Sequence, residues 1–221
     1  MAAAARAAGY QYLAITDHSK ALAMANGLDE RRIVEQIAEI RRVAADFPDL
    51  TLLAGCECDI RQDGAMDLDN EALAQLDLVI GSVHSYMNME SAAMTDRLLR
   101  ALENPYVNVI GHPTGRILLR REGYPFDFER IATEAAKRNV YLEINASPER
   151  LDLSANLLRI AKAKGAKFVI STDAHNVRHL ENMKYGVWMA RRGWLGPGDI
   201  LNTLDAAALQ AALRHKSGDT Q

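Results

Sequence analysis

The sequence predicts an α/β protein in which about six parallel strands form a barrel-like sheet with helices outside it. Short runs rich in Val, Ile and Leu recur along the chain, and stretches with helical spacing of apolar residues separate them. Strands that are apolar almost throughout are covered on both faces, as in a parallel sheet between helices. The repeating unit is therefore a strand, a loop and a helix.

Six apolar runs have the length and composition of buried strands. The predicted strands cover residues 12–16, 51–58, 76–83, 107–111, 140–145 and 167–172. Predicted helices cover residues 29–46, 91–102, 127–138 and 154–164, and two more follow near the C-terminus. The expected N-caps of these four helices are Asp29, Ser91, Asp127 and Ser154. Gly165 is expected to end the last of the four in a left-handed conformation.

Length and composition are those of an ordinary globular protein. We expect one domain over residues 1–215 and a frayed tail at 216–221. Hydrophobic residues make up 48% of the chain, but no stretch is apolar enough to span a bilayer, so no membrane partner is expected. The first ten residues lack the apolar core of a signal peptide, and a cytoplasmic location is expected.

The cysteine spacing excludes a disulfide framework, and the net charge argues against a protein with a generally basic surface for nucleic acid. Cys56 and Cys58 lie one residue apart, too close to staple distant segments, which fits a reducing compartment. They alternate with Glu57 along a strand, so we expect them to pack beneath helices on the opposite face. The formal net charge of −3 gives no general attraction for nucleic acid, so any DNA binding must come from a local basic site or from elsewhere.

Polar side chains that can bind metals gather where the predicted strands end. They are Asp17, His18, Glu57, His84, His112, Asp173 and His175. In a parallel barrel the active site forms at the carboxyl ends of the strands. For a single histidine, a buried imidazole bonded to the backbone is an equally good explanation. The repetition at one register of five strands favours metal binding, because buried charges are costly unless paired or metal-bound.

The type of ligand indicates the chemistry. Imidazole nitrogen and carboxylate oxygen suit Zn, Mn or Fe, and Glu57 or Asp173 can bridge two ions. Such a site turns a metal-bound water into the nucleophile and clamps a phosphate ester, so phosphoester hydrolysis is the leading reaction class. His175 and His179 have the spacing of a zinc-protease motif, but the glutamate after the first histidine is absent. We expect His179 and His215 on the surface.

Basic residues near the strand ends are candidates for binding phosphate. Arg116 follows His112, and Arg150 follows the fifth predicted strand. The planar guanidinium group matches phosphate oxygens, although a solvated surface position explains each of these residues equally well. Lys20 is a weaker candidate.

Several segments, taken in order, resemble the polymerase and histidinol phosphatase (PHP) superfamily, and more narrowly the C-terminal PHP domain of bacterial family X DNA polymerases. They are YLAITDHS, GHPTGRILLRREGY, LEINASPERLDL, FVISTDAH and YGVWMARRGWL, which together extend over nearly the whole chain. The stretches GHPTGR and INASPERLDL are the more specific ones. The resemblance implies a distorted (β/α)7 TIM-like barrel and a manganese-stimulated 3′-5′ exonuclease and phosphoesterase.

The resemblance also implies a set of ligands. It makes His18, Glu57, His84, His112, Asp173 and His175 metal ligands. Glu57 would bridge ions, Asp17 would lie in the second shell, and the family holds up to three ions. A first strand with a His-x-His motif would precede the helix expected at residues 1–8, and this sequence does not contain it. We therefore expect fewer ions and an unpaired strand edge.

Three functions remain open from the sequence. The first is exonuclease-type hydrolysis at a DNA 3′ end. The second is a phosphomonoesterase of the histidinol phosphatase type, which would cleave a small phosphate ester and leave single-stranded DNA ends intact. The third is a non-catalytic PHP remnant that serves as an interaction module for a polymerase-containing chain.

Overall fold

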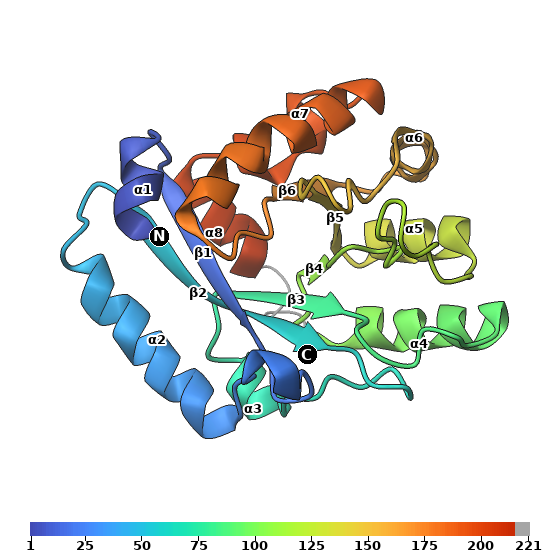
Figure 1. The fold of residues 1–221 in the computed structure, drawn as a ribbon, viewed down its shortest axis with the longest axis horizontal. Coiled ribbons are helices and arrows are strands. Elements are labelled where there is room, and N and C mark those ends of the chain that lie inside the picture. The colour runs from blue at the N-terminus through green and yellow to red at the C-terminus, as the bar shows by residue number, and fades with distance from the viewer. Residues whose placement is uncertain (215–221) are drawn as a thin grey trace.

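Six parallel strands form one sheet that curls into part of a barrel (Figure 1). The computed structural model describes residues 1–214, and of Ala23 only the backbone. His215 and the tail predicted at 216–221 lie outside the described residues. The strands pair in sequence order, β1 to β6. They are β1 Tyr12–His18, β2 Thr51–Asp59, β3 Leu78–Ser82, β4 Val109–Ile110, β5 Tyr141–Asn145 and β6 Phe168–Ser171. The predicted α/β class and strand count are confirmed.

Strand β4 is shorter than the predicted 107–111 and keeps only Val109 and Ile110. The side chain of Asn108 explains why the strand begins only at Val109. Its Oδ1 accepts the Val79 N–H at 2.9 Å, and its Nδ2 donates to the Leu213 carbonyl at 3.0 Å. A side-chain hydrogen bond thus replaces one backbone hydrogen bond between β3 and β4.

Helices surround the sheet in the predicted order. The longer ones are α2 Glu30–Ala44, α4 Ser91–Glu103, α5 Phe128–Lys137, α6 Ala155–Ala163, α7 Met183–Arg192 and α8 Ala206–Arg214. The short ones are α1 Ala2–Ala7, α3 Asn70–Leu73 and the 3-10 turns η1 Ala23–Ala25, η2 Val177–Asn182, η3 Pro197–Asp199 and η4 Leu201–Thr203. Gly165 follows the C-cap Lys164 of α6 and has a φ of +84°, as expected. Within residues 1–214, no helix combines the length and hydrophobicity needed to cross a bilayer.

Three of the four predicted N-caps accept a backbone N–H through their side chains. They are Asp29, Asp127 and Ser154. The prediction for Ser91 is wrong. The first helical bond of α4 runs from the Met94 N–H to the Glu90 carbonyl, so Ser91 already lies inside the helix and Glu90 occupies the cap position.

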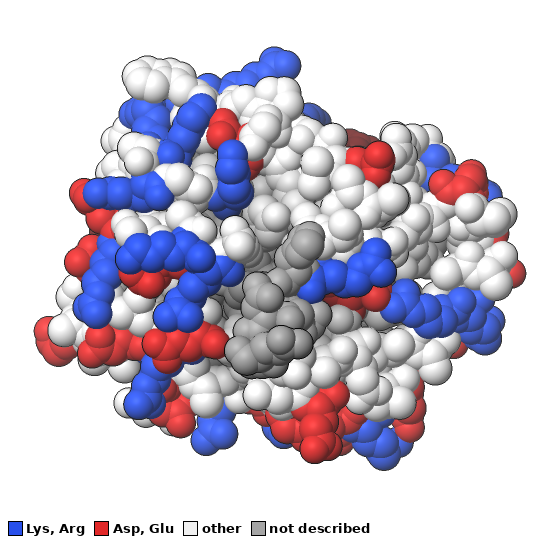
Figure 2. All heavy atoms as spheres, turned by 180° about the vertical axis from the view of Figure 1, so that it is seen from behind, with Lys and Arg blue, Asp and Glu red and all other residues white. Residues whose placement is uncertain are grey.

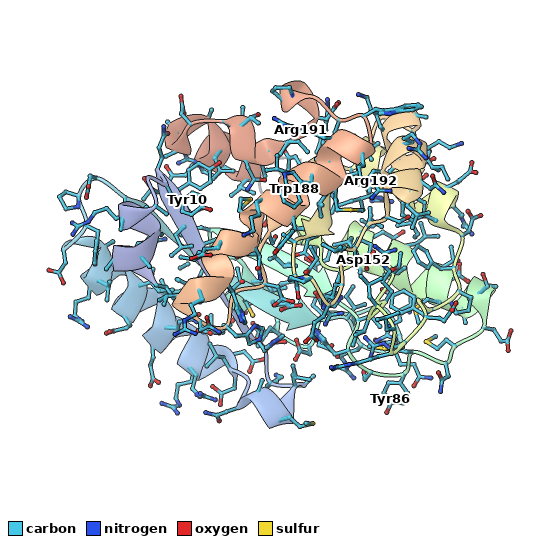
Figure 3. All side chains as sticks on the ribbon, turned by 45° about the horizontal axis from the view of Figure 1, so that its top comes forward. Tyr10, Tyr86, Asp152, Trp188, Arg191 and Arg192 are labelled. Carbon is cyan, nitrogen blue, oxygen red and sulfur yellow. The ribbon has the colours of Figure 1, made fainter. Side chains whose placement is uncertain are left out.

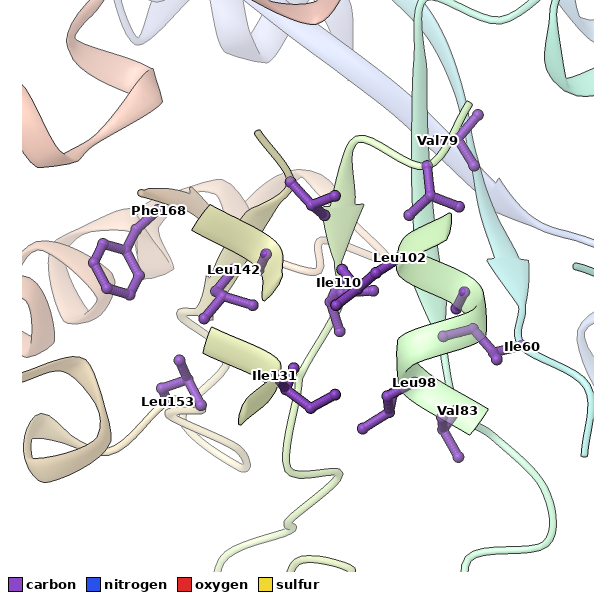
Figure 4. Packing of buried hydrophobic residues seen from close by; sticks show 14 of the residues in the cluster. Ile60, Val79, Val83, Leu98, Leu102, Ile110, Ile131, Leu142, Leu153 and Phe168 are labelled. Atoms are coloured by element: carbon purple, nitrogen blue, oxygen red, sulfur yellow. The ribbon is translucent and has the colours of Figure 1, made fainter. Parts of the chain in front are cut away.

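The core lies on both faces of the sheet. On the outer face, Ile110, Leu142 and Phe168 pack with residues such as Leu98 and Ile131 of the surrounding helices (Figure 4). On the inner face, residues of β2, β3 and β4 pack against apolar residues of η4 and α8. Because both faces are covered, the strands read as continuous apolar runs. The amino ends of the strands are filled in this way, and the carboxyl ends stay open for polar groups.

The end strands β1 and β6 face each other across an open cleft of about 1650 Å³. Both strands line it, together with the inner sides of α7 and α8. Asn202 covers part of the β6 edge, because its side chain bonds the Ile170 N–H at 2.7 Å and the Ile170 carbonyl at 2.9 Å. The Tyr12 hydroxyl of β1 donates to the Asn202 carbonyl at 2.9 Å. One end of the cleft is therefore bridged by η4.

Candidate metal centre

Four of the predicted ligands meet at the carboxyl ends of neighbouring strands. Strand pairing places His18 of β1 directly beside Glu57 of β2. His84 and His112 each follow two residues after the end of β3 and β4. Cys56 and Cys58 are free thiols buried in the outer core, so the alternation along β2 points Glu57 to the inner face.

Glu57 lies among three imidazoles. Its Oε1 is 3.0 Å from His112 Nε2 and 3.3 Å from His84 Nε2, and its Oε2 is 3.4 Å from His18 Nδ1. His18, Glu57 and His84 each offer one donor atom, all within 4.8 Å of one another. The buried Nδ1 of His18 makes no hydrogen bond. Nitrogen and carboxylate donors that converge in this way fit Zn, Mn or Fe.

The electrostatics of the cluster centre on the Glu57 charge. Burial alone would raise the pKa of Glu57, but hydrogen bonds from His112 and His84 lower it well below its usual range. Burial alone would lower the pKa of His84, but its bonds to Asp59 and Glu57 raise it to about 9. Burial lowers the pKa of His18. A divalent cation would take the place of the protons that these groups share.

Asp59 orients one imidazole of the cluster and was missed by the sequence analysis. Its Oδ1 lies 2.9 Å from His84 Nδ1, so the other ring nitrogen of His84 faces Glu57. A carboxylate behind a metal-binding histidine fixes the ring and increases its basicity. The signal in the sequence was position, because Asp59 follows Glu57 by two residues and shares its face of β2.

Asp173 and His175 lie beside the cluster rather than within it. Asp173 Oδ2 is 3.5 Å from Arg150 Nε and 3.2 Å from Asn145 Nδ2. The His175 side chain is 67% exposed, and its ring centroid is 6.4 Å from that of His18. The structure therefore brings His18, Glu57, His84 and His112 into contact and places the other two predicted ligands at the rim.

Strand β5 contributes two polar residues that the sequence analysis did not single out. The His112 backbone N–H donates to Glu143, and Asn145 Nδ2 contacts both Glu143 Oε2 at 3.3 Å and Asp173 Oδ2. Burial raises the pKa of Glu143 to about 7. Two polar residues at alternate positions of an otherwise apolar strand were the available signal. They connect the loops that carry His112 and Asp173.

The predicted substrate-binding residues differ in what they contact. Arg116 donates through Nε to the Arg150 carbonyl at 3.0 Å and also bonds the Leu151 carbonyl, so its guanidinium group holds a loop. Lys20 forms an ion pair with Glu30. Arg150 lies near Asp173, and its buried Nη1 has no hydrogen-bond partner. Arg150 is thus the predicted substrate-binding residue whose guanidinium group lies next to a predicted ligand, Asp173.

Asp17 does not reach the cluster. Its carboxylate is exposed and accepts a hydrogen bond from Gln36 of α2. Neighbouring residues in a strand point to opposite faces, so the side chains of Asp17 and His18 diverge. The predicted second-shell position is filled by Asp59 instead.

The curled parallel sheet and its histidine-rich site at the strand ends define an α/β-barrel-type protein with a candidate metal centre. The chain belongs to the PHP domain family, whose model matches residues 1–147. It is 44% identical over 214 residues to the DNA polymerase/3'-5' exonuclease PolX of Bacillus subtilis, an alignment that covers 97% of this chain. The chain spans 38% of the length of that relative.

Other relatives are phosphatases by name. A probable phosphatase of Clostridium acetobutylicum is 33% identical over 146 residues, which cover 62% of this chain and 57% of the relative. Among solved structures, histidinol phosphate phosphatase from Lactococcus lactis, complexed with zinc, L-histidinol and phosphate, superposes with a TM-score of 0.58. It is 18% identical and covers 88% of this chain and 86% of its own, so it supports the fold alone.

Proposed function

We propose that this chain is a metal-dependent phosphoesterase of the PHP type that hydrolyses DNA phosphodiesters from a 3′ end. The observation that carries the proposal is the convergence of His18, His84 and His112 on the Glu57 carboxylate. These four residues are proposed to hold Mn or Zn, with Fe as a further option. Asp173 and His175 at the rim are proposed as ligands of a further ion. A bound ion of this kind supplies a hydroxide nucleophile near neutral pH and offsets phosphate charge.

The remaining residues of the site are proposed to orient ligands and substrate. Asp59 holds the His84 ring, and Glu143 with Asn145 holds the loops of His112 and Asp173. Arg150, which lies beside Asp173, is proposed to bind a phosphate oxygen through its guanidinium group. Arg116 bonds the backbone of Arg150 and Leu151, which keeps that guanidinium group in place.

The choice of DNA as substrate rests on similarity to PolX over 97% of this chain. The relatives named as phosphatases favour a second candidate, hydrolysis of a small phosphate monoester. A third, without catalysis, is a binding module for a polymerase-containing chain. The three differ in what they release and from which substrate.

The deciding experiment measures release of nucleotides from a single-stranded oligonucleotide labelled at its 3′ end, with Mn²⁺ and with chelator. We expect Mn²⁺-dependent release that His112→Ala abolishes. Release of phosphate from monoesters alone would favour the second candidate. A protein that cleaves neither substrate, although it is folded and metal-loaded, would contradict the proposal and favour the binding module.

Metal content tests the site independently of the substrate. Glu57→Gln is expected to lower the affinity for Mn²⁺ or Zn²⁺ at least tenfold, because it removes the anionic donor common to the three imidazoles. Mass spectrometry of the purified protein and calorimetric titration measure the change. Glu122→Gln, an exposed carboxylate, is the control and should match the wild type. Equal metal content in both variants would rule out Glu57 as a ligand.

A further inference from the structure

Both tryptophans of the chain are exposed to solvent at the same helix. The Trp188 side chain on α7 is 55% exposed, and that of Trp194, just after the helix, is 73% exposed. The Tyr185 ring packs edge-on against Trp188 with a centroid distance of 5.5 Å. Large aromatic side chains that stay in water at one place indicate a binding surface.

These aromatic side chains alternate with cations. Lys184, Trp188 and Arg192 are four residues apart and exposed, so they share one side of α7, while Gly186 and Ala190 on the other side are buried. Figure 3 shows Trp188 midway along the helix, with Arg191 and Arg192 nearer its C-terminal end. We call Lys184, Trp188, Arg192 and Trp194 the tryptophan stripe.

Within residues 1–214, the cations of this helix have no acidic partners. Residues 181–194 contain Lys184, Arg191 and Arg192 but one carboxylate, Glu181. No carboxylate within the described part of the chain forms an ion pair with any of those three cations. The lysines in and after the neighbouring helix α6 differ in this respect. Lys162, Lys164 and Lys167 all have acidic partners. On the face of the molecule shown in Figure 2, basic side chains also lie next to acidic ones.

Trp194 is fixed in place although it is exposed. The Arg159 guanidinium group lies 4.8 Å from the centre of its ring, and Lys162 donates to its backbone carbonyl at 2.8 Å. Arg159 also donates to the Arg192 carbonyl at 3.2 Å, which ties α6 to the end of α7. A ring held in this way loses little conformational entropy when a partner stacks on it.

We propose that the tryptophan stripe binds single-stranded DNA and extends the catalytic cleft along the outside of α7. Bases stack on aromatic rings irrespective of sequence, and neighbouring cations pair with the phosphates. With a net charge of −3, binding depends on such a local contact. Trp and Arg also occur in protein interfaces, but Lys is depleted there, and the clustered cations of α7 complement a phosphate backbone.

The position of α7 connects the stripe to the site. Met183 and Val187 on its inner side line the same cleft as His18 and Glu57, so the helix is one wall of that cleft. A single strand held on the outside of this wall needs to pass only over the helix to reach the metal ligands. The inference rests on the proposed action on DNA.

Fluorescence tests the stripe directly, because both tryptophans of the chain belong to it. The protein is titrated with a 12-nucleotide thymidine homopolymer in chelator at low salt, so that binding is measured without hydrolysis. We expect quenching of the tryptophan emission and a rise in anisotropy of a labelled oligonucleotide. Trp188→Ala and Trp194→Ala should each weaken binding about tenfold, and Lys184→Glu with Arg192→Glu should weaken it further.

The control is a matched charge change on α2, where Arg31→Glu with Arg42→Glu should leave the affinity close to that of the wild type. Binding that survives the stripe variants overturns the inference, and so does the absence of binding. Loss of self-association in the tryptophan variants, without an effect on DNA, would assign the stripe to a protein contact and also overturn it.

A small diester, bis(p-nitrophenyl) phosphate, separates this inference from the proposed function. Its Mn²⁺-dependent cleavage should be unchanged in the stripe variants, because it is too short to reach the stripe. If the diester is cleaved and DNA binding does not depend on the stripe, the role of the stripe is overturned and the catalytic proposal stands. Stripe-dependent binding without any hydrolysis would support the stripe and contradict the catalytic proposal.

Discussion

Arg97 of α4 is a buried cation that holds two loops next to the candidate metal centre. Its side chain is 2% exposed, and it donates to the Ser85 carbonyl at 3.0 Å and to the Ile60 carbonyl. Ser85 follows His84 directly, and Ile60 follows Asp59. No ion pair joins Arg97 to a carboxylate of residues 1–214, so backbone carbonyls supply its bonds. Arg97 therefore stabilises the conformation of the two loops through hydrogen bonds and not through an ion pair.

Arg97→Met is expected to lower the free energy of unfolding by about 2 kcal/mol. Each buried carbonyl left without a donor costs about 1–3 kcal/mol, and removal of the buried charge recovers part of that loss. Urea denaturation measures the change. Arg100→Met on the exposed side of the same helix is the control and should stay within about 0.5 kcal/mol of the wild type. Equal stability of the two variants would contradict the role given to Arg97.

The site residues that could be predicted from the sequence are those whose position depends on strand register. His18, Glu57, His84 and His112 follow parallel neighbouring strands, and the structure brings them together. Arg116 could not be placed in this way, because its partners are carbonyls of a loop more than thirty positions away. Whether an arginine binds phosphate or backbone depends on loop conformation, which local pattern does not specify.

At the scale of elements, Asn202 acts as a substitute for a neighbouring strand. Its side-chain amide accepts the Ile170 N–H and donates to the Ile170 carbonyl, as an adjacent backbone would. Ile200 pairs with Phe168 in an isolated parallel bridge at the same edge. An edge strand is covered here by a loop and an amide, which limits pairing with other chains.

Asn202→Ala is expected to lower the free energy of unfolding by about 1–3 kcal/mol, because two backbone groups of β6 lose their partner. Thermal and urea denaturation provide the measurement. The matched control is Asn156→Ala on the surface of α6, where the lost contact to Arg159 is exposed and the change should be below about 0.5 kcal/mol. Indistinguishable values for the two variants would show that water replaces the amide.

Elements with strong periodicity were predicted well, and short or irregular ones were not. The strands β2, β5 and β6 and the helices α2, α5 and α6 follow the predicted ranges closely. The helix α3 and the 3-10 turns are too short to leave a periodic pattern. The use of Asn202 as an edge cover depends on contacts across 32 positions of sequence, which a local pattern does not contain.

At the scale of the molecule, the sheet is open on one side. The Gln11 carbonyl accepts the Thr51 N–H, and the Ser19 N–H donates to the Glu57 carbonyl. Alternation along β1 therefore turns the backbone of Ala14 and Thr16 away from β2 and toward the cleft. Among the residues described, no backbone group pairs with Ala14 on that side. The edge of β1 can accept a further strand.

This edge predicts self-association, which sedimentation velocity at rising protein concentration would detect. Ala14→Pro should reduce association, because proline removes the outward N–H and is tolerated at the edge of a sheet. The fold should persist, since the ladder to β2 uses the alternate residues of β1. Ala14→Val keeps the N–H and should associate at least as strongly as the wild type. A chain that remains monomeric at every concentration, or a proline variant that associates like the valine variant, would show that the cleft shields the β1 edge from other copies.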